Sequence, residues 1–154
     1  MKRIVSILLC VLLVGSNLTL PAKATENTDT SEQIMVSQTI EYVGNDSYYI
    51  ETIYVPSVQP YGYTKTGTKT AAYVVAGTTI YSVSVTGTFY FDGSTSNATS
   101  ASGSIATYVE NAKIKSCDAH TSGNSAVATG SVVYLGFTLQ KTVTLSCDKD
   151  GNLS

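Results

Sequence analysis

Tyrosine is the residue type in this chain with the most potential for recognition. Eleven of the 154 residues are Tyr and none is Trp. A Tyr ring has apolar faces and a polar tip, so exposed rings stack on sugars or anchor protein contacts at small entropic cost. Tyr48 and Tyr49 are adjacent and must point to opposite sides of a strand, and Tyr61 and Tyr63 lie in a proline-containing segment. We predict binding roles for these four residues; half-buried strand positions are the alternative for most of the eleven.

Residues suited to hydrolysis are sparse. A Ser-His-Asp triad would have to use His120, the one histidine, and the nucleophile motif Gly-x-Ser-x-Gly does not occur. Glycoside hydrolysis needs two carboxylates that face one sugar. The acids that we considered for it are Glu41, Glu51, Asp92 and Glu110. We expect a surface histidine and solvated acids, and therefore a protein that is not an enzyme.

Metal ligands are also few. Cys117, Asp118 and His120 lie together without a second cluster to complete a zinc site. The run Asp-Lys-Asp-Gly-Asn at 148–152 alternates oxygen donors as a calcium loop does, but its Gly is not in the sixth position and no Glu closes the loop. The sequence therefore predicts neither a metal site nor a cofactor.

The N-terminal segment predicts export. Lys2 and Arg3 precede an apolar run over Ile4 to Val14, and Ala22-Lys23-Ala24 forms a small-x-small cleavage site. The apolar run is eleven residues long, whereas a membrane-spanning helix needs about 20. We interpret residues 1–24 as a signal peptide that is cleaved after Ala24, and we expect a secreted, extracellular protein without a membrane span.

Cleavage changes the charge and the cysteine content. It would leave six basic and eleven acidic residues, a formal net charge of −5, which disfavours nucleic acid as a partner. It would also remove Cys10 and leave Cys117 and Cys147. Two cysteines in an exported chain permit one intramolecular bridge, so we expect a Cys117–Cys147 disulfide, with two free thiols as the alternative.

The rest of the chain is patterned as short strands. Residues 25–33 are polar and predict a disordered lead, residues 34–55 predict a β-hairpin, and two prolines within 56–64 predict a linker. In 65–154, runs of Val, Ile, Thr and Tyr alternate with turn residues. We expect an all-β fold: an antiparallel β-sandwich, Ig-like or similar, preceded by the N-terminal hairpin.

The clearest strand covers residues 79–91. Gly87 in its middle is typical of a bulge or a close backbone approach. We expect the segment 95–104 to be an edge strand or a loop, and 105–111 to be irregular. One face of the 79–91 strand is predicted to carry Tyr81, Val83, Val85, Gly87, Phe89 and Phe91, and the other Ser82, Ser84, Thr86, Thr88 and Tyr90.

Three segments resemble one family. They are Val-Thr-Gly-Thr-Phe at 85–89, Ser-Gly-Asn-Ser-Ala-Val-Ala-Thr-Gly at 122–130, and the C-terminal Cys-Asp-Lys-Asp-Gly-Asn-Leu-Ser at 147–154. Over residues 34–154 the chain resembles small secreted proteins of Gram-positive, Clostridia-like bacteria, although it lacks their Trp in the middle third and their Cys near 97–99. The resemblance implies secretion and a β-rich fold, and it brings no catalytic residues with it.

These observations lead to one functional hypothesis with two alternatives. We expect an exported, non-enzymatic β-sandwich that binds an extracellular glycan or protein through Tyr-bearing edges and loops. A small secreted hydrolase is one alternative, and a secreted competition factor with a protein partner is the other.

Overall fold

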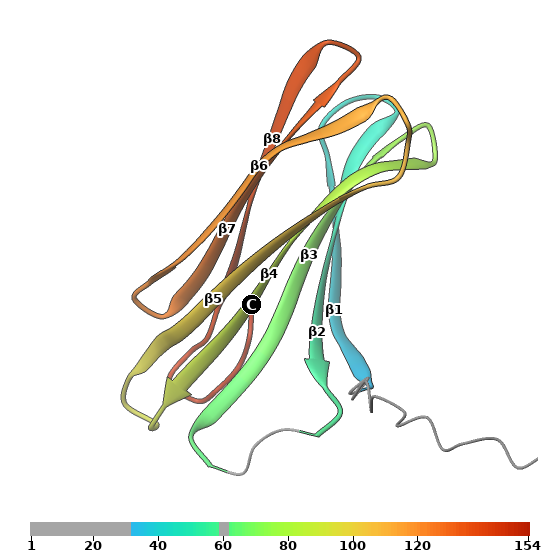
Figure 1. The fold of residues 1–154 in the computed structure, drawn as a ribbon. Coiled ribbons are helices and arrows are strands. Elements are labelled where there is room, and N and C mark those ends of the chain that lie inside the picture. The colour runs from blue at the N-terminus through green and yellow to red at the C-terminus, as the bar shows by residue number, and fades with distance from the viewer. Residues whose placement is uncertain (1–31, 59–61) are drawn as a thin grey trace, which may run out of the picture.

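The computed structural model describes residues 32–58 and 62–154, which form eight antiparallel strands and, within these ranges, no helix (Figure 1). The expected all-β sandwich is confirmed. The predicted signal peptide and residues 25–31 of the predicted lead lie outside the described residues. The strands are β1 (Gln33–Tyr42), β2 (Ser47–Pro56), β3 (Thr64–Val75), β4 (Thr78–Phe91), β5 (Ser96–Thr107), β6 (Ala112–Ser122), β7 (Ser125–Tyr134) and β8 (Phe137–Ser146).

The strands form two sheets in chain order. Sheet A has the order β1-β2-β3-β4-β5 and sheet B the order β6-β7-β8. These are two successive meanders, and not the Greek key of an immunoglobulin domain. The expected hairpin is β1 and β2, and it belongs to the sandwich because β2 continues the sheet by pairing with β3. Sheet B packs against β3, β4 and β5, so β1 lies at the uncovered margin of sheet A (Figure 1).

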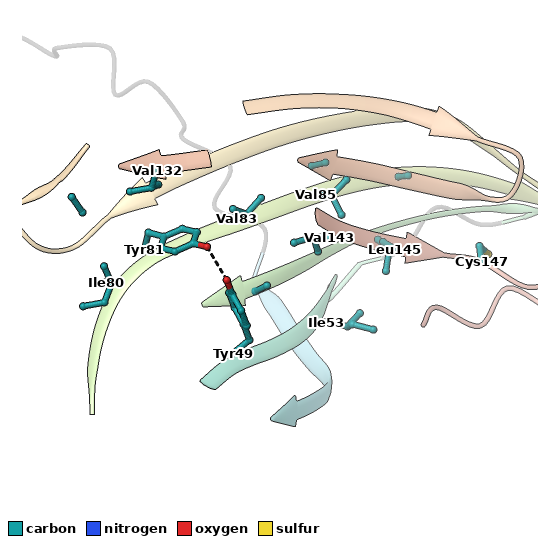
Figure 2. Packing of buried hydrophobic residues seen from close by; sticks show 14 of the residues in the cluster. Tyr49, Ile53, Ile80, Tyr81, Val83, Val85, Val132, Val143, Leu145 and Cys147 are labelled. Atoms are coloured by element: carbon teal, nitrogen blue, oxygen red, sulfur yellow. Dashed lines mark hydrogen bonds between the residues drawn. The ribbon is translucent and has the colours of Figure 1, made fainter. Parts of the chain in front are cut away.

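The core lies between the sheets and follows the period-two pattern of β4. Tyr81, Val83, Val85 and Phe89 are fully buried, so the predicted inner face of this strand is confirmed. Sheet B adds a second layer of buried side chains, and Figure 2 shows the two layers facing each other. The sheet B members of this layer are Ala126, Ala128, Val132, Val143 and Leu145, with Cys147 directly after β8.

Gly87 marks a close approach between the sheets. A Cβ atom at Gly87 would lie 2.7 Å from the Cβ of Ala126 and 2.7 Å from the Cζ of Phe89. The bulge of this region lies one step further on, between Thr88 and Phe89. Gly130 of sheet B has the same role from the other side, because a Cβ there would lie 2.6 Å from the Cγ2 of Val83. Small residues therefore set the distance between the layers.

Two tight turns follow from local sequence. Ala76 and Gly77 connect β3 to β4 with φ of 47° and 77°, and Leu135 and Gly136 connect β7 to β8 with φ of 50° and 83°. Consecutive positive φ values are those of the two-residue turn whose twist matches that of a hairpin.

Of the two alternatives for 95–104, the edge strand is confirmed because β5 is an edge of sheet A, whereas residues 105–107 were expected to be irregular and instead continue this strand. Ser96–Thr107 is one continuous strand, and the irregular segment is limited to 108–111. The sequence signal was weak because β5 is built of Ser, Ala and Gly. These small residues fit tight packing: a Cβ at Gly103 would lie 3.2 Å from Ala119, Ala128 and Cys117.

Substitution of Gly87 by Ala tests the close approach. We expect Gly87→Ala to destabilise the fold by about 1–3 kcal/mol, because the added methyl must displace Ala126 or Phe89. Urea unfolding measures the change, with the outward-facing Ser102→Ala as the control. Equal stability of both variants would show that the sheets separate without cost at this point.

Candidate functional site

The outer face of sheet A presents a regular array of hydroxyl groups. In β3 the sequence Thr-Lys-Thr-Gly-Thr-Lys-Thr has Thr at every second residue, which places all four Thr on the side away from sheet B. Strands β4 and β5 continue the rows, since directly paired residues share a face. We call this surface the hydroxyl face. It comprises Thr66, Thr88 and Ser100 in one row, Thr68, Thr86 and Ser102 in the next, and Thr70, Ser84 and Ser104 in the third.

Hydrogen bonds tie the rows across β3 and β4. The hydroxyls of Thr68 and Thr86 are 2.8 Å apart, and those of Thr70 and Ser84 are also 2.8 Å apart. A hydroxyl has one donor hydrogen and two acceptor lone pairs, so each bonded pair keeps a donor and several acceptors for a ligand.

The hydroxyl face carries no charged residue. The charged residues of β1 to β5 are Glu41, Glu51, Lys65 and Lys69, and the register places all four on the inner side. Lys65 donates to the Gly151 carbonyl at 2.9 Å, and Lys69 lies 3.5 Å from Glu51. Solvent-facing surfaces usually carry many charges. A wide face without them suits an uncharged ligand that forms hydrogen bonds.

Two aromatic pairs, each with at least one strongly exposed ring, lie near the two ends of the hydroxyl face. Tyr42 and Tyr48 have ring centroids 5.6 Å apart, and Tyr63 and Tyr90 have centroids 6.3 Å apart. Tyr42 is 73% exposed and Tyr63 is 62% exposed. Tyr48 pairs with Val74 and Tyr90 with Thr64, the two ends of β3. The ten residue steps between those positions separate the pairs by about 33 Å along the strand.

The four predicted Tyr residues have different positions. Tyr63 is exposed and Tyr48 is half-buried on the outer side, whereas Tyr61 lies outside the described residues. The prediction for Tyr49 is wrong. Its side chain is 9% exposed, and its hydroxyl bonds that of Tyr81 at 2.9 Å inside the core (Figure 2). Burial raises the pKa of both phenols, so they act as neutral core groups.

Sequence reasoning missed part of the site. Tyr42 and the Thr rows of β3 were not singled out, although the period-two run of Thr at 64–70 was visible. That run alone leaves open which side faces solvent. The pairing of β3 with β4 decides which side faces solvent. Thr68 pairs with Thr86, which lies on the side of β4 away from the core.

Glu41 and Glu51, two of the four acids considered for catalysis, lie close together because both form ion pairs with Lys141. The Nζ of Lys141 lies 2.8 Å from Oε2 of Glu41 and 3.0 Å from Oε1 of Glu51, and 4.2 Å from the ring centre of Tyr49. Burial disfavours ionisation of Glu51, but the hydrogen bond and charge of Lys141, with Lys69, outweigh it and lower its pKa. A general acid needs a raised pKa. This cluster instead holds β1 and β2 to sheet B.

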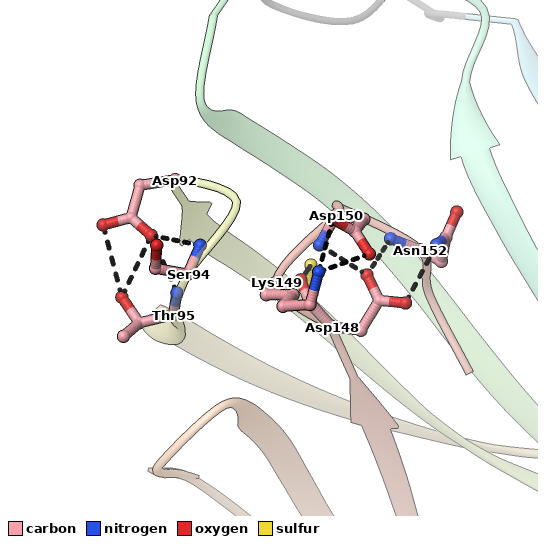
Figure 3. Close-up of polar contacts among 8 residues, drawn as sticks. Asp92, Ser94, Thr95, Asp148, Lys149, Asp150 and Asn152 are labelled. Atoms are coloured by element: carbon pink, nitrogen blue, oxygen red, sulfur yellow. Dashed lines mark hydrogen bonds and ion pairs between the residues drawn. The ribbon is translucent and has the colours of Figure 1, made fainter.

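Asp92, the third of the four acids, and Asp148 stabilise turns (Figure 3). Asp92 accepts the N–H groups of Ser94 and Thr95 at 2.9 and 2.7 Å. Asp148 accepts those of Asp150 and Asn152 at 2.9 and 2.8 Å. The Asn152 side-chain amide also donates to Asp148, at 2.8 Å, and this bond, with that of the Asn152 backbone N–H, lowers the pKa of Asp148. The backbone N–H groups of Thr95 and Ser94 lower the pKa of Asp92. Asp148 therefore organises its own loop, and the described residues contain no group of three or more metal-ligating side chains.

His120 lies exposed on the outer side of β6. It pairs with Val127, and Asp118 on the same side pairs with Thr129. Glu110 is exposed in the turn before β6. The structure therefore does not bring His120 together with the carboxylates at Lys141, which lie on the inner side.

The structure does not contain the expected Cys117–Cys147 disulfide. Cys117 and Cys147 are both free. Cys117 pairs with Gly130, whereas the Cys147 N–H donates to the Asn124 carbonyl at 3.0 Å. The six residues from Asn124 to Gly130 correspond to about 20 Å along the strand. Bridged cysteines need Cα atoms within about 7 Å.

Comparison with protein-family models, curated proteins and solved structures finds no match. Among the residues that the structure describes, no helix is long and apolar enough to cross a membrane. Functional inference for this chain therefore rests on its own geometry.

The Lys141 cluster gives a pH-dependent prediction. We expect Glu51→Gln to cost about 1–2 kcal/mol at pH 7, because Lys141 and Lys69 lose a charged acceptor. The pKa of Glu51 is lowered in the folded state, so its contribution is complete above its ordinary pKa and disappears as the pH falls through the folded value. Urea unfolding should therefore show a larger difference at pH 7 than at pH 2.5.

The control for this experiment is Glu110→Gln, in an exposed turn, which should change stability by less than about 0.5 kcal/mol at both pH values. A Glu51→Gln difference of the same size at pH 2.5 would mean that Glu51 acts through packing and not through its charge.

Proposed function

We propose that this chain is an exported, non-enzymatic β-sandwich that binds uncharged polysaccharide of a cell wall or host surface. The observation that carries the proposal is the hydroxyl face: three rows of Thr and Ser, a Tyr pair near each end, and no charge. The candidate residues are Tyr42, Tyr48, Tyr63 and Tyr90. Tyr42 and Tyr90 take the place of Tyr49, which is buried, and of Tyr61, which lies outside the described residues.

The chemistry of the face matches that of a sugar polymer. Sugar rings have apolar C–H faces that stack on Tyr, and hydroxyl edges that exchange hydrogen bonds with Thr and Ser. The separation of about 33 Å between the Tyr pairs favours a polymer over a mono- or disaccharide. The twist of a five-stranded sheet favours a single chain that follows the strands over a planar crystal surface.

Other classes of ligand and reaction have less support. A polyanion such as nucleic acid would find no basic side chain on the hydroxyl face. A hydrolase would need a carboxyl group that donates a proton. Glu41 and Glu51 instead both accept hydrogen bonds from Lys141 in ion pairs. Export is supported by the signal pattern in residues 1–24 and by the resemblance to small secreted proteins.

Retention on polysaccharide tests the proposed function. The full chain, expressed with its own N-terminal segment in a Gram-positive host and purified from the medium, is incubated with cell wall and with insoluble neutral polysaccharides. We expect retention, and about a tenfold loss of affinity in each of the pairs Tyr42→Ala with Tyr48→Ala and Tyr63→Ala with Tyr90→Ala.

Phe137→Ala is the matched control, because it removes an exposed ring (72% exposed) from sheet B and should leave retention unchanged. Absence of the chain from every pellet would overturn the proposal. If both double variants are retained as well as the wild-type chain, the proposed Tyr site is wrong.

The intact mass of the chain from the medium tests export and thiol state. We expect a mass that begins at Thr25 and two alkylated cysteines once the chain is unfolded without reductant, because register keeps Cys117 and Cys147 apart. A mass that includes residues 1–24 would argue against cleavage, and protection of both thiols would contradict the register.

A further inference from the structure

We propose that β1 binds a second copy of this chain, strand against antiparallel strand, to form a continuous ten-stranded sheet. β1 is an edge of sheet A, and all ten of its residues are exposed. Natural edge strands are usually short or guarded by Lys, Pro or a covering segment. β1 has no Lys or Pro and carries a single bulge, between Met35 and Ser37. Its exposed apolar residues are Ile34, Met35, Val36, Ile40 and Tyr42, with exposed fractions of 50–73%.

The backbone of β1 offers a regular set of hydrogen-bonding groups. The Val43 N–H donates to the Ser47 carbonyl at 3.0 Å, toward β2. Because main-chain groups alternate in direction along an antiparallel strand, Glu41 and Thr39 also point to β2. Ile40 and Gln38 then direct their N–H and C=O groups to the free edge. A second strand would satisfy them.

The near absence of charge on β1 favours a second β1 strand as its partner. The single charged residue of β1 is Glu41, which Lys141 of the same chain neutralises at 2.8 Å. An acidic or basic partner would find no complementary charge on this strand, whereas two copies of β1 meet without like-charge repulsion. β6, an edge of sheet B, shows the contrast, because it carries Lys113 and Lys115.

Segments of the same chain fit the edge less well than β1 itself. Residues 25–31, Thr-Glu-Asn-Thr-Asp-Thr-Ser, have two acids and no apolar side chain, so they do not match an apolar strand. Residues 59–61 contain a proline, which interrupts strand pairing. The strand of matching length and polarity is β1 of another molecule.

A pairing centred on Gln38 satisfies both backbone and side chains. With Val36 as the bulged residue, Ile40 lies opposite Met35 of the second copy on the outer side, and Thr39 lies opposite Ser37 on the inner side. The two-fold axis runs perpendicular to the sheet. Both hydroxyl faces therefore lie on one side of the dimer. The gain in avidity that follows rests on the proposed function, but the dimer itself does not.

Sedimentation equilibrium of the purified full chain tests the dimer. We expect a concentration-dependent dimer, at least a tenfold weaker self-association for Ile40→Lys, and no change for the control Ser102→Lys, which adds the same charge to the outer side of β5. A cooperative thermal unfolding transition of Ile40→Lys confirms that it still folds. A chain that stays monomeric up to millimolar concentration, or an Ile40→Lys variant that dimerises like the wild type, overturns the proposal.

A cross-link tests the register. Gln38→Cys in a Cys117→Ala background should give a covalent dimer on mild oxidation, whereas Thr86→Cys, on the outer side of the central strand β4, should not. Failure of Gln38→Cys to cross-link overturns the pairing centred on this residue. If the chain is a dimer that no polysaccharide retains, this inference stands and the proposed function is overturned. If the chain is a monomer that polysaccharide retains, the proposed function stands and this inference is overturned.

Discussion

The close packing of sheet B on β3, β4 and β5 is the constraint on which the rest of the structure depends. Gly87 faces Ala126 and Gly130 faces Val83, and neither glycine has room for a Cβ atom. Interiors pack at crystal-like density, so such contacts fix both the layer spacing and the strand register. With β4 fixed in this way, the alternation along every neighbouring strand decides which side chains meet the core and which meet solvent.

The arrangement of charge follows from that packing. Sheet B is narrower than sheet A, so the inner side of β1 is left at an open margin. The inner side of β2 still enters the core through Tyr49 and Ile53, so the open margin is that of β1. The acids and lysines of sheet A lie on the inner side, and Lys141 crosses from sheet B to meet Glu41 and Glu51. The outer side, free of charge, is left to hydroxyls and Tyr rings. Ionic and neutral surfaces are thus separated by the two sides of one sheet.

Much of the fold could be predicted from the sequence, because alternation and turn residues are local signals. The inner residues of β4 and the turns at Gly77 and Gly136 follow from such signals. The segment 96–107 was harder to predict, because a strand of Ser, Ala and Gly has almost no contrast between its two sides.

The candidate site was less predictable, because it depends on non-local register. Adjacent residues Tyr48 and Tyr49 must face opposite ways, but only pairing with β3 decides which one enters the core. The count of cysteines likewise permitted a disulfide, while the offset between Cys117 and Cys147 along sheet B depends on two further strands.

The order of strands also bears on how such a chain reaches its folded state. In both sheets every ladder joins strands that are neighbours in sequence. A polypeptide that crosses a membrane in extended form, N-terminus first, would find each new strand's partner already outside, and sheet A would be complete before β6 emerged. The last event would be the closure of β7 and β8 over β4, when Leu145 and Val143 leave water. Until that moment the apolar side of β4 would be open to solvent, and this is the interval in which the chain would most need protection from aggregation.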